Sequence, residues 1–392
     1  MRVAVLQGVR DVAPAAWDAL VGDDGSPFLE WAWLSALEES EAASADSGWL
    51  PQHLALWDGD RLVGACPLYV KAHSRGEFVF DHGWATAAHG AGIRYYPKLL
   101  VGVPFTPATG ARFLAAPADR ARVVPALAQV IEETCEAQDF SSAHVNFCLP
   151  DEVEALKARG WLLRIGYQYQ WRNPGFATFD DYLTSLKSKR RNQVRREQRE
   201  LDEQQIAIEA LAGDAIPDAL FPRMYDLYRR TVNLNPWGQQ YLNRTTFDLF
   251  RERFRSRLCF VVARRAGRVI AGTFNVEKAG VMYGRYWGTE KDVRHLHFNV
   301  CYYAAIRHAI GRGHQRFEPG AGGEFKQLRG FDPAETSSMH FVAEPRLRKA
   351  VRDYLVRERR AVVDEMEWLE ERSQLRRDRP GPAEPGEPEE PA

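Results

Sequence analysis

Residues 258–288, LCFVVARRAGRVIAGTFNVEKAGVMYGRYWG, decide the fold, because an earlier part of the chain repeats their pattern. The earlier copy reads HLALWDGDRLVGACPLYVK over residues 53–71 and GEFVFDHGW over residues 76–84. Each copy predicts three strands joined by tight turns, since apolar and β-branched runs alternate with Gly and Asp. Gly59-Asp60-Arg61 aligns with Ala266-Gly267-Arg268 without a gap. The two copies predict an internally duplicated chain.

A helix and a further strand follow each three-strand unit. Residues 118–138 precede a strand at 142–148, and residues 298–314 precede a strand at 315–319. A crossover helix joins parallel strands, so the last strand of each unit should lie parallel to the third. We therefore predict an α/β (α+β) fold made of two tandem domains, each a mixed β-sheet flanked by helices.

The turn WRNPGF (171–176) predicts a boundary between domains 1–174 and 175–376. Apolar residues at helical spacing predict one long helix from residue 344 to about residue 377. The Pro-, Gly- and Glu-rich tail, residues 377–392, cannot bury a core and should be disordered.

Composition excludes several classes of protein. The net charge is −1, so any polyanion must bind a local patch rather than the whole molecule. Five scattered cysteines without CxxC spacing argue against a disulfide framework and against a zinc knuckle. The sequence contains no recognisable signal peptide and no membrane-length apolar run, which predicts a cytoplasmic protein.

Several short motifs, taken in order, resemble one known family. They are PFLEWAWLSALEES (27–40), GEFVFDHGW (76–84), YYPKLLVGVPFTP (95–107), KSKRRNQVRRE (187–197), YGRYWG (283–288), HFNVCYYAAI (297–306) and GAGGEFKQLRGF (320–331). As a set they resemble the Fem-like (FemAB-like, peptidoglycan biosynthesis/recognition) branch of the GNAT acyltransferase superfamily. The resemblance implies tandem GNAT-like domains. The sequence departs from the family at Gln170 and Phe325, where the family has histidines, so no role of those histidines carries over.

Residues 182–201 predict a helix with one basic side. At about 100° per residue, its leucines and Val194 fall on one face, while Lys187, Arg191, Arg195 and Arg199 form an adjoining stripe with Arg196 beside it. Guanidinium groups match phosphate oxygens, which predicts binding of a lipid diphosphate, a tRNA acceptor stem or the CoA pyrophosphate. A solvated charged face is the alternative. Glu197 and Glu200 are expected on the far side.

The ends of two strands in the second half carry the candidate chemistry. In the GNAT plan the strands ending near Arg285 and Glu318 splay apart and hold the donor's acyl group between them. Glu318 would orient the attacking amine or accept its proton, and Lys326 in the Gly-rich loop would stabilise an oxyanion or a phosphate. A salt bridge from Glu318 to Arg285 or Arg316 is the structural alternative. The other predicted contacts with donor or acceptor in this half are Tyr286, Trp287, Asn299, Gly320 and Phe325.

The matching place in the first half holds further polar and aromatic residues. Asp81, His82, Trp84, Tyr96 and Lys98 are predicted to line an acceptor cleft between the lobes, although Asp81 and His82 equally fit a structural pair. We assign no metal site, because His295-x-His297 lacks a third ligand at a persuasive spacing.

The resemblance implies an acyltransferase that moves an aminoacyl or acyl group onto an amine, possibly of a peptidoglycan precursor or peptide. Better-known Fem enzymes use aminoacyl-tRNA, and other GNAT relatives use acyl-CoA. The CoA-binding pattern R/Q-x-x-G-x-G/A does not occur before residue 298, which favours aminoacyl-tRNA as the co-substrate and implies no tightly bound cofactor. Two alternatives stay open: an acyl-CoA-dependent N-acyltransferase, and a recognition module for peptidoglycan or nucleic acid with a decayed transferase site.

Overall fold

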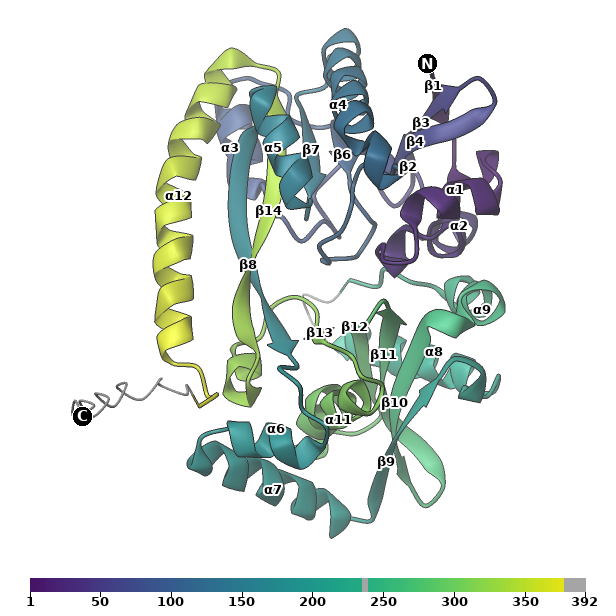
Figure 1. The fold of residues 1–392 in the computed structure, drawn as a ribbon, viewed down its shortest axis with the longest axis vertical. Helices are drawn as coiled ribbons and strands as arrows, with labels where there is room; N and C mark the ends of the chain where they lie inside the picture. The colour runs from purple at the N-terminus through teal and green to yellow at the C-terminus, as the bar shows by residue number, and fades with distance from the viewer. Residues whose placement is uncertain (235–238, 377–392) are drawn as a thin grey trace, which may run out of the picture.

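One sheet of 11 strands runs through both halves of the chain in the computed structural model, which describes residues 1–234 and 239–376 (Figure 1). Its strand order is β2 (Trp49–Pro51), β5 (Leu68–Lys71), β6 (Lys98–Val101), β7 (Ser142–Asn146), β14 (Asp332–Val342), β8 (Leu162–Arg172), β13 (Arg316–Glu318), β12 (Val281–Thr289), β11 (Arg268–Lys278), β10 (Leu258–Arg265) and β9 (Ile206–Ala212). A second sheet holds β1 (Arg2–Leu6), β3 (His53–Asp58) and β4 (Arg61–Cys66). The predicted α/β class is confirmed.

The second half follows the predicted order. β10, β11 and β12 form an antiparallel meander, and β13 pairs parallel to β12. The crossover runs through α10 (Leu296–Phe298), a π-helical turn (Asn299–Tyr303) and α11 (Ala304–Gly311). The strands β10 and β11 are rich in apolar residues and almost entirely buried, as expected where helices cover the sheet.

The first half departs from the prediction at its third strand. Residues 76–81 form no strand, and residues 82–90 form the helix α3 (His82–Gly90). The strand that lies parallel to β7 is β6, joined to it through α4 (Arg120–Ala137). Glu77 and Asp81 explain the difference, because both carboxylates turn inward and bind Lys98 at the start of β6. Local apolar periodicity does not reveal such an ion cluster.

The two halves exchange strands. β14 comes from the end of the described chain, yet it pairs with β7 of the first half as well as with β8. The helix α12 (Pro345–Glu371) follows it and lies along β8 and β14 (Figure 1), burying Leu347, Val351 and Leu355 against α3. The boundary predicted at 174/175 falls in the turn after β8. The residues beyond that turn therefore contribute to both halves.

The basic segment forms two helices rather than one. α6 (Phe179–Ser185) ends before Leu186, and α7 (Ser188–Asp202) begins after Lys187. Leu186 is extended and buried, and it forms a β-bridge with Leu375 after α12, which interrupts the helix. The predicted apolar face is confirmed, because Leu183, Val194 and Leu201 are buried as well.

Five further helices among the described residues pack against the sheets or against one another. They are α1 (Pro14–Val21), α2 (Trp31–Glu39), α5 (Pro150–Ala158), α8 (Leu220–Leu234) and α9 (Arg244–Arg253). α2 contacts α9 across the boundary between the halves. Of the helices in the described part of the chain, none combines the length and apolar character that crossing a bilayer requires.

Candidate active site

The parallel strands β12 and β13 separate after a short ladder. Their pairing ends at Tyr283 and Glu318, whereas β12 continues to Thr289 with hydrogen bonds to β11 on its other side. Pro319 has no N–H, and Gly320 has a φ of 86°. A Cβ on Gly320 would lie 3.0 Å from the carbonyl oxygen of Gly284, so the backbones touch there without a side chain. Beyond this contact, no strand in the described chain pairs with the edge of β12 that faces β13. This is the separation of strands expected for a GNAT fold.

Glu318 lies buried at the point of separation, with 5% of its surface exposed. Its Oε1 is 3.0 Å from Nε of Arg316 and 3.5 Å from Nε2 of Gln170. Burial raises the pKa of Glu318 to about 7, although Arg316 and Arg285 act to lower it. A carboxyl group with this pKa can both release and accept a proton near neutral pH.

Lys326 closes the glycine-rich loop that follows β13. Its Nζ donates to the carbonyl oxygens of Gly320 at 2.6 Å and Ala321 at 3.2 Å, and the side chain is buried. Burial, helped by the charge of Arg285, lowers the pKa of Lys326 to about 8. The sequence suggested a mobile cation, but the structure holds this ammonium group in a fixed place beside the gap.

Arg285 connects the gap to the first half of the chain. It is the extra residue of a β-bulge, since Gly284 pairs with Asn275 and Tyr286 with Phe274. Bulges near active sites redirect a side chain, and this guanidinium donates to the carbonyl oxygen of Phe105. It also lies 5.5 Å from the ring centre of Phe28.

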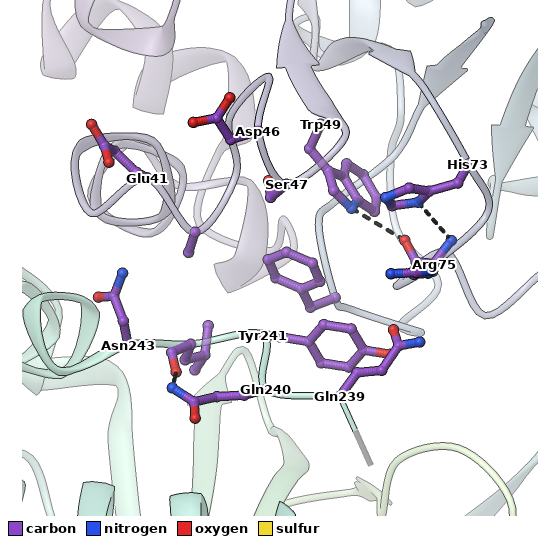
Figure 2. A pocket seen from close by; sticks show the side chains of 13 residues that line it. Glu41, Asp46, Ser47, Trp49, His73, Arg75, Gln239, Gln240, Tyr241 and Asn243 are labelled. Atoms are coloured by element: carbon purple, nitrogen blue, oxygen red, sulfur yellow. Dashed lines mark hydrogen bonds between the residues drawn. The ribbon is translucent and has the colours of Figure 1, made fainter. Parts of the chain in front are cut away.

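A pocket of about 460 Å³ lies between the halves, with Phe105 in its wall (Figure 2). Phe105 stacks on Tyr241 from the second half, with ring centres 4.7 Å apart. Polar groups surround this stacked pair: Glu41, Asp46, Ser47, His73, Arg75, Gln239, Gln240 and Asn243. No motif in the sequence marks these residues, because they lie on separate loops that meet only after folding.

The residues predicted for an acceptor cleft in the first half form a buried ion cluster instead. Lys98 donates to Asp81 and, at 2.8 Å, to Glu77, while Tyr95 donates to Asp81 at 2.6 Å. Burial raises the pKa of Glu77 to about 7, whereas Lys98 holds the pKa of Asp81 low against the effect of its burial. The two carboxyl groups in turn raise the pKa of Lys98 above its usual value. The cluster is thus a charge-paired core element.

The other predicted residues of the first half surround this cluster. The hydroxyl of Tyr96 lies 2.5 Å from that of Ser74, and Trp84 packs on His340 with ring centres 4.9 Å apart. His82 is exposed and stacks on Phe80, so it does not pair with Asp81. These side chains do not join Glu318 and Lys326.

The remaining residues predicted for the second half hold the walls of the gap. Asn299 donates to the backbone carbonyls of Glu197 at 3.2 Å and His295 at 3.0 Å, which fixes α7 against the crossover. Tyr286 packs on Tyr228, Trp287 packs on His297, and the exposed ring of Phe325 lies near Phe298.

The basic stripe does not open into the gap. Arg195 and Arg199 line a separate groove of about 580 Å³ with Arg307 of α11. Nζ of Lys187 donates to the carbonyl of Ser373 at 2.6 Å, so it anchors the end of the α12 segment. Nη2 of Arg191 donates to the hydroxyl of Ser188 at 3.4 Å, and Nε of Arg196 lies 3.9 Å from Oε1 of Glu200.

The side of α7 away from the basic stripe carries contacts to the crossover. Glu197 is fully buried, accepts a hydrogen bond from Tyr303 at 2.6 Å and lies 3.4 Å from Arg329. Glu200 lies 3.2 Å from the ring of His295, where the crossover begins. The start of the crossover helix is therefore flanked by carboxylates.

Comparisons with known proteins agree with this geometry. A family model described as FemAB-like, peptidoglycan biosynthesis/recognition, matches residues 8–377, whereas no curated protein matches the sequence. FemX is similar in structure, with a TM-score of 0.54 at 11% identity, over 90% of this chain and 100% of that one. L-PGS from Bacillus licheniformis has a TM-score of 0.52 at 7% identity, over 90% and 98%.

A third similar structure is the C-terminal domain of a putative lysylphosphatidylglycerol synthetase from Agrobacterium fabrum. Its TM-score is 0.54 at 10% identity, over 87% of this chain and 95% of that one. Such identities show the fold alone, and that fold is the tandem GNAT-like arrangement expected from the repeat. Because the family model covers almost the entire chain, the protein belongs to the FemAB-like family of peptidoglycan biosynthesis/recognition proteins, a family of GNAT-fold transferases.

Proposed function

We propose that the protein transfers an aminoacyl group from aminoacyl-tRNA to an amine of a peptidoglycan precursor or peptide. The observation that carries the proposal is the buried Glu318, with a pKa near neutrality, at the point where β12 and β13 separate. Family membership supports the reaction class, and the lysylphosphatidylglycerol synthetase domain is a similarly folded protein whose name denotes an aminoacyl product.

The reaction needs one proton acceptor and one oxyanion site. The neutral amine attacks the ester carbonyl of the donor, a C–N bond forms, and the ester C–O bond breaks with release of the tRNA hydroxyl. Glu318 takes the amine proton and returns it to the leaving oxygen. The free edge of β12 beyond Tyr283 offers N–H groups to the oxyanion, and Lys326 adds a fixed positive charge.

The surroundings of the crossover favour tRNA over CoA. A CoA pyrophosphate binds where a helix N-terminus offers N–H groups and positive potential. Here Glu200 and Glu197 flank His295 at that position, and carboxylates repel a pyrophosphate. Arg195 and Arg199 line a groove that does not include Glu318 or Lys326, and a donor as large as tRNA can reach both places.

The pocket between the halves suits the acceptor. An amine acceptor arrives mainly as an ammonium ion, and Glu41 and Asp46 place carboxylates in the wall of that pocket. The Phe105–Tyr241 pair and Arg285 then link the pocket to the gap that holds Glu318.

A transfer assay tests the proposal. Purified protein is incubated with a radiolabelled aminoacyl-tRNA pool and an amine acceptor, and in parallel with labelled acyl-CoA. We expect RNase-sensitive formation of labelled product from the tRNA pool. If label reaches the product from acyl-CoA alone, acyl-CoA is the donor in place of aminoacyl-tRNA. If neither donor supports transfer, the recognition module is favoured.

Replacing Glu41 and Asp46 by Gln and Asn should raise KM for the acceptor several-fold with little change in kcat. The reason is that the double variant removes attraction for the ammonium ion but leaves the reacting groups in place. Initial rates over a range of acceptor concentrations measure the effect. D60N, which removes an exposed acid in the β3–β4 turn, should match the wild type.

Replacing Arg195 and Arg199 by Gln should weaken tRNA binding and reduce its salt dependence. Each lost phosphate contact lowers the slope of log K against log salt by about 1, so the double variant should lose about 2. Filter binding at several salt concentrations gives the slope. R357Q/R360Q on the exposed side of α12 is the control, and an equal loss there would mean only a general effect of charge.

A further inference from the structure

Four side chains with metal-binding atoms meet in the core of the second half. They come from four parts of the fold: Cys259 from β10, Glu277 from β11, His308 from α11, and His314 from the turn before β13. Cys259 is fully buried, Glu277 and His314 are buried, and the side chain of His308 is 13% exposed. None of the four takes part in the proposed transfer.

Three of the ligand atoms lie close together, and His314 lies beside one of them. The Cys259 sulfur, a Glu277 oxygen and a His308 ring nitrogen all lie within 4.8 Å of one another. Nε2 of His308 is 2.7 Å from Oε1 of Glu277, and Nε2 of His314 is 3.1 Å from the same oxygen. Ligands at about 2.0–2.3 Å from a tetrahedral ion lie roughly 3.3–3.7 Å apart, so small outward shifts would accommodate one.

The unsatisfied nitrogen of His314 distinguishes this group from an ordinary hydrogen-bonded cluster. Although its Nε2 lies close to the Glu277 carboxylate, the contact lacks hydrogen-bond geometry, and this buried nitrogen has no hydrogen-bond partner within the described chain. Buried polar atoms are nearly always satisfied. The unsatisfied ring nitrogen of His314 is therefore available as a fourth ligand, 3.1 Å from the carboxylate oxygen of Glu277.

The local fold fixes all four positions. Cys259 pairs with Asn275 across β10 and β11, so Glu277, two residues further, lies on the same face as its diagonal neighbour. Gly313 has a φ of 69°, and the N–H of His314 donates to the carbonyl of Ala309 at 2.8 Å. This closure of α11 turns His314 back toward His308.

We propose that Cys259, Glu277, His308 and His314 form a closed, structural zinc site. A thiolate, two imidazoles and a carboxylate suit Zn²⁺ rather than Mg²⁺ or Ca²⁺, which prefer oxygen ligands. On binding, the Cys259 thiol loses its proton to solvent as the Zn–S bond forms. With Glu277 ionised and both histidines neutral, the ligands cancel the charge of the ion, as a buried site requires.

The ion would connect the sheet to the start of β13. His314 lies two residues before Arg316, and β13 ends at Glu318. A metal held by β10, β11 and α11 therefore fixes the short strand that places Glu318. The site stands on its own ligands, so it does not depend on the identity of the donor or acceptor.

Metal analysis of the full-length protein tests the site. We expect about one zinc per chain by plasma mass spectrometry after dialysis, and a lower Tm after chelation. Replacing zinc by Co²⁺ should give a thiolate-to-cobalt charge-transfer absorption, since the sulfur is a direct ligand. The C259S variant should lose that absorption, and H314Q should lose most of the bound metal.

C135S is the matched control, because Cys135 is a buried thiol of α4 in the first half. It should bind zinc and cobalt as the wild type does. The site would be excluded if folded wild-type protein bound neither metal in competition with a chromophoric chelator, or bound both equally well in C259S and H314Q. If a variant fails to fold, the cobalt spectrum of the wild type alone decides the question.

Discussion

Replacing Glu318 by Gln should lower kcat by about 10²- to 10⁴-fold, because an amide cannot accept the amine proton. The exposed E335Q on β14 should keep wild-type rates. Steady-state rates with saturating donor measure the difference. A rate within a few-fold of the wild type would remove Glu318 from the reaction and leave only its ion pair with Arg316.

The pH profile gives this prediction a second readout. In the wild type, kcat/KM should rise as pH passes about 7, where Glu318 loses its proton, and fall above about 8, where Lys326 loses its charge. The rising limb should disappear in E318Q, whereas the falling limb should remain. Loss of both limbs would point to a general change in folding.

The stability contributed by Glu318 should fall over the pH range in which its contribution to activity rises. Burial raises the pKa of Glu318 above that of an unfolded glutamate, so the folded state prefers the protonated form. The contribution of this group to stability is complete below about pH 4.5 and is lost as pH rises through about 7. E318Q resembles the protonated form, so its Tm should exceed that of the wild type at about pH 8 but not at about pH 4.

Replacing Lys98 by Met should destabilise the protein by about 3–5 kcal/mol, since it leaves Asp81 and Glu77 buried without their cation. Denaturant unfolding measures the loss. R94M, which breaks the exposed ion pair of Arg94 with Asp139, should change stability little.

A triple variant tests the cause of that loss. K98M/D81N/E77Q removes both orphaned charges and should recover part of the stability lost in K98M. An equal loss in the single and triple variants would assign the effect to packing of the lysine stem rather than to charge.

The second half was predictable because its information is local. Alternating apolar residues and Gly turns predict the meander, and a crossover helix predicts the parallel pairing that ends at Glu318. The same rules misplace the third strand of the first half, because Glu77 and Asp81 meet Lys98 only through tertiary contact. They also predict one basic helix, because the contact between Leu186 and Leu375, which interrupts it, joins residues about half the chain apart.

Two groups of residues could not be predicted from the sequence, and the reason is the same for both. The pocket between the halves and the four candidate metal ligands are each built from segments far apart in the chain. Cys259 and Glu277 become neighbours through strand register, and no spacing motif records that. His295 and His297 have a suggestive spacing, but His295 lies against Glu200 and His297 against Trp287.

The exchange of β14 into the first half sets an order for biosynthesis. Because β7 obtains this neighbour only from residues 332–342, a nascent chain on the ribosome cannot complete its amino-terminal lobe until almost all of the chain has emerged. Until then β7 presents an unpaired edge, the kind of surface that promotes aggregation. The two lobes therefore mature together, and a truncation that stops before β14 leaves neither of them whole.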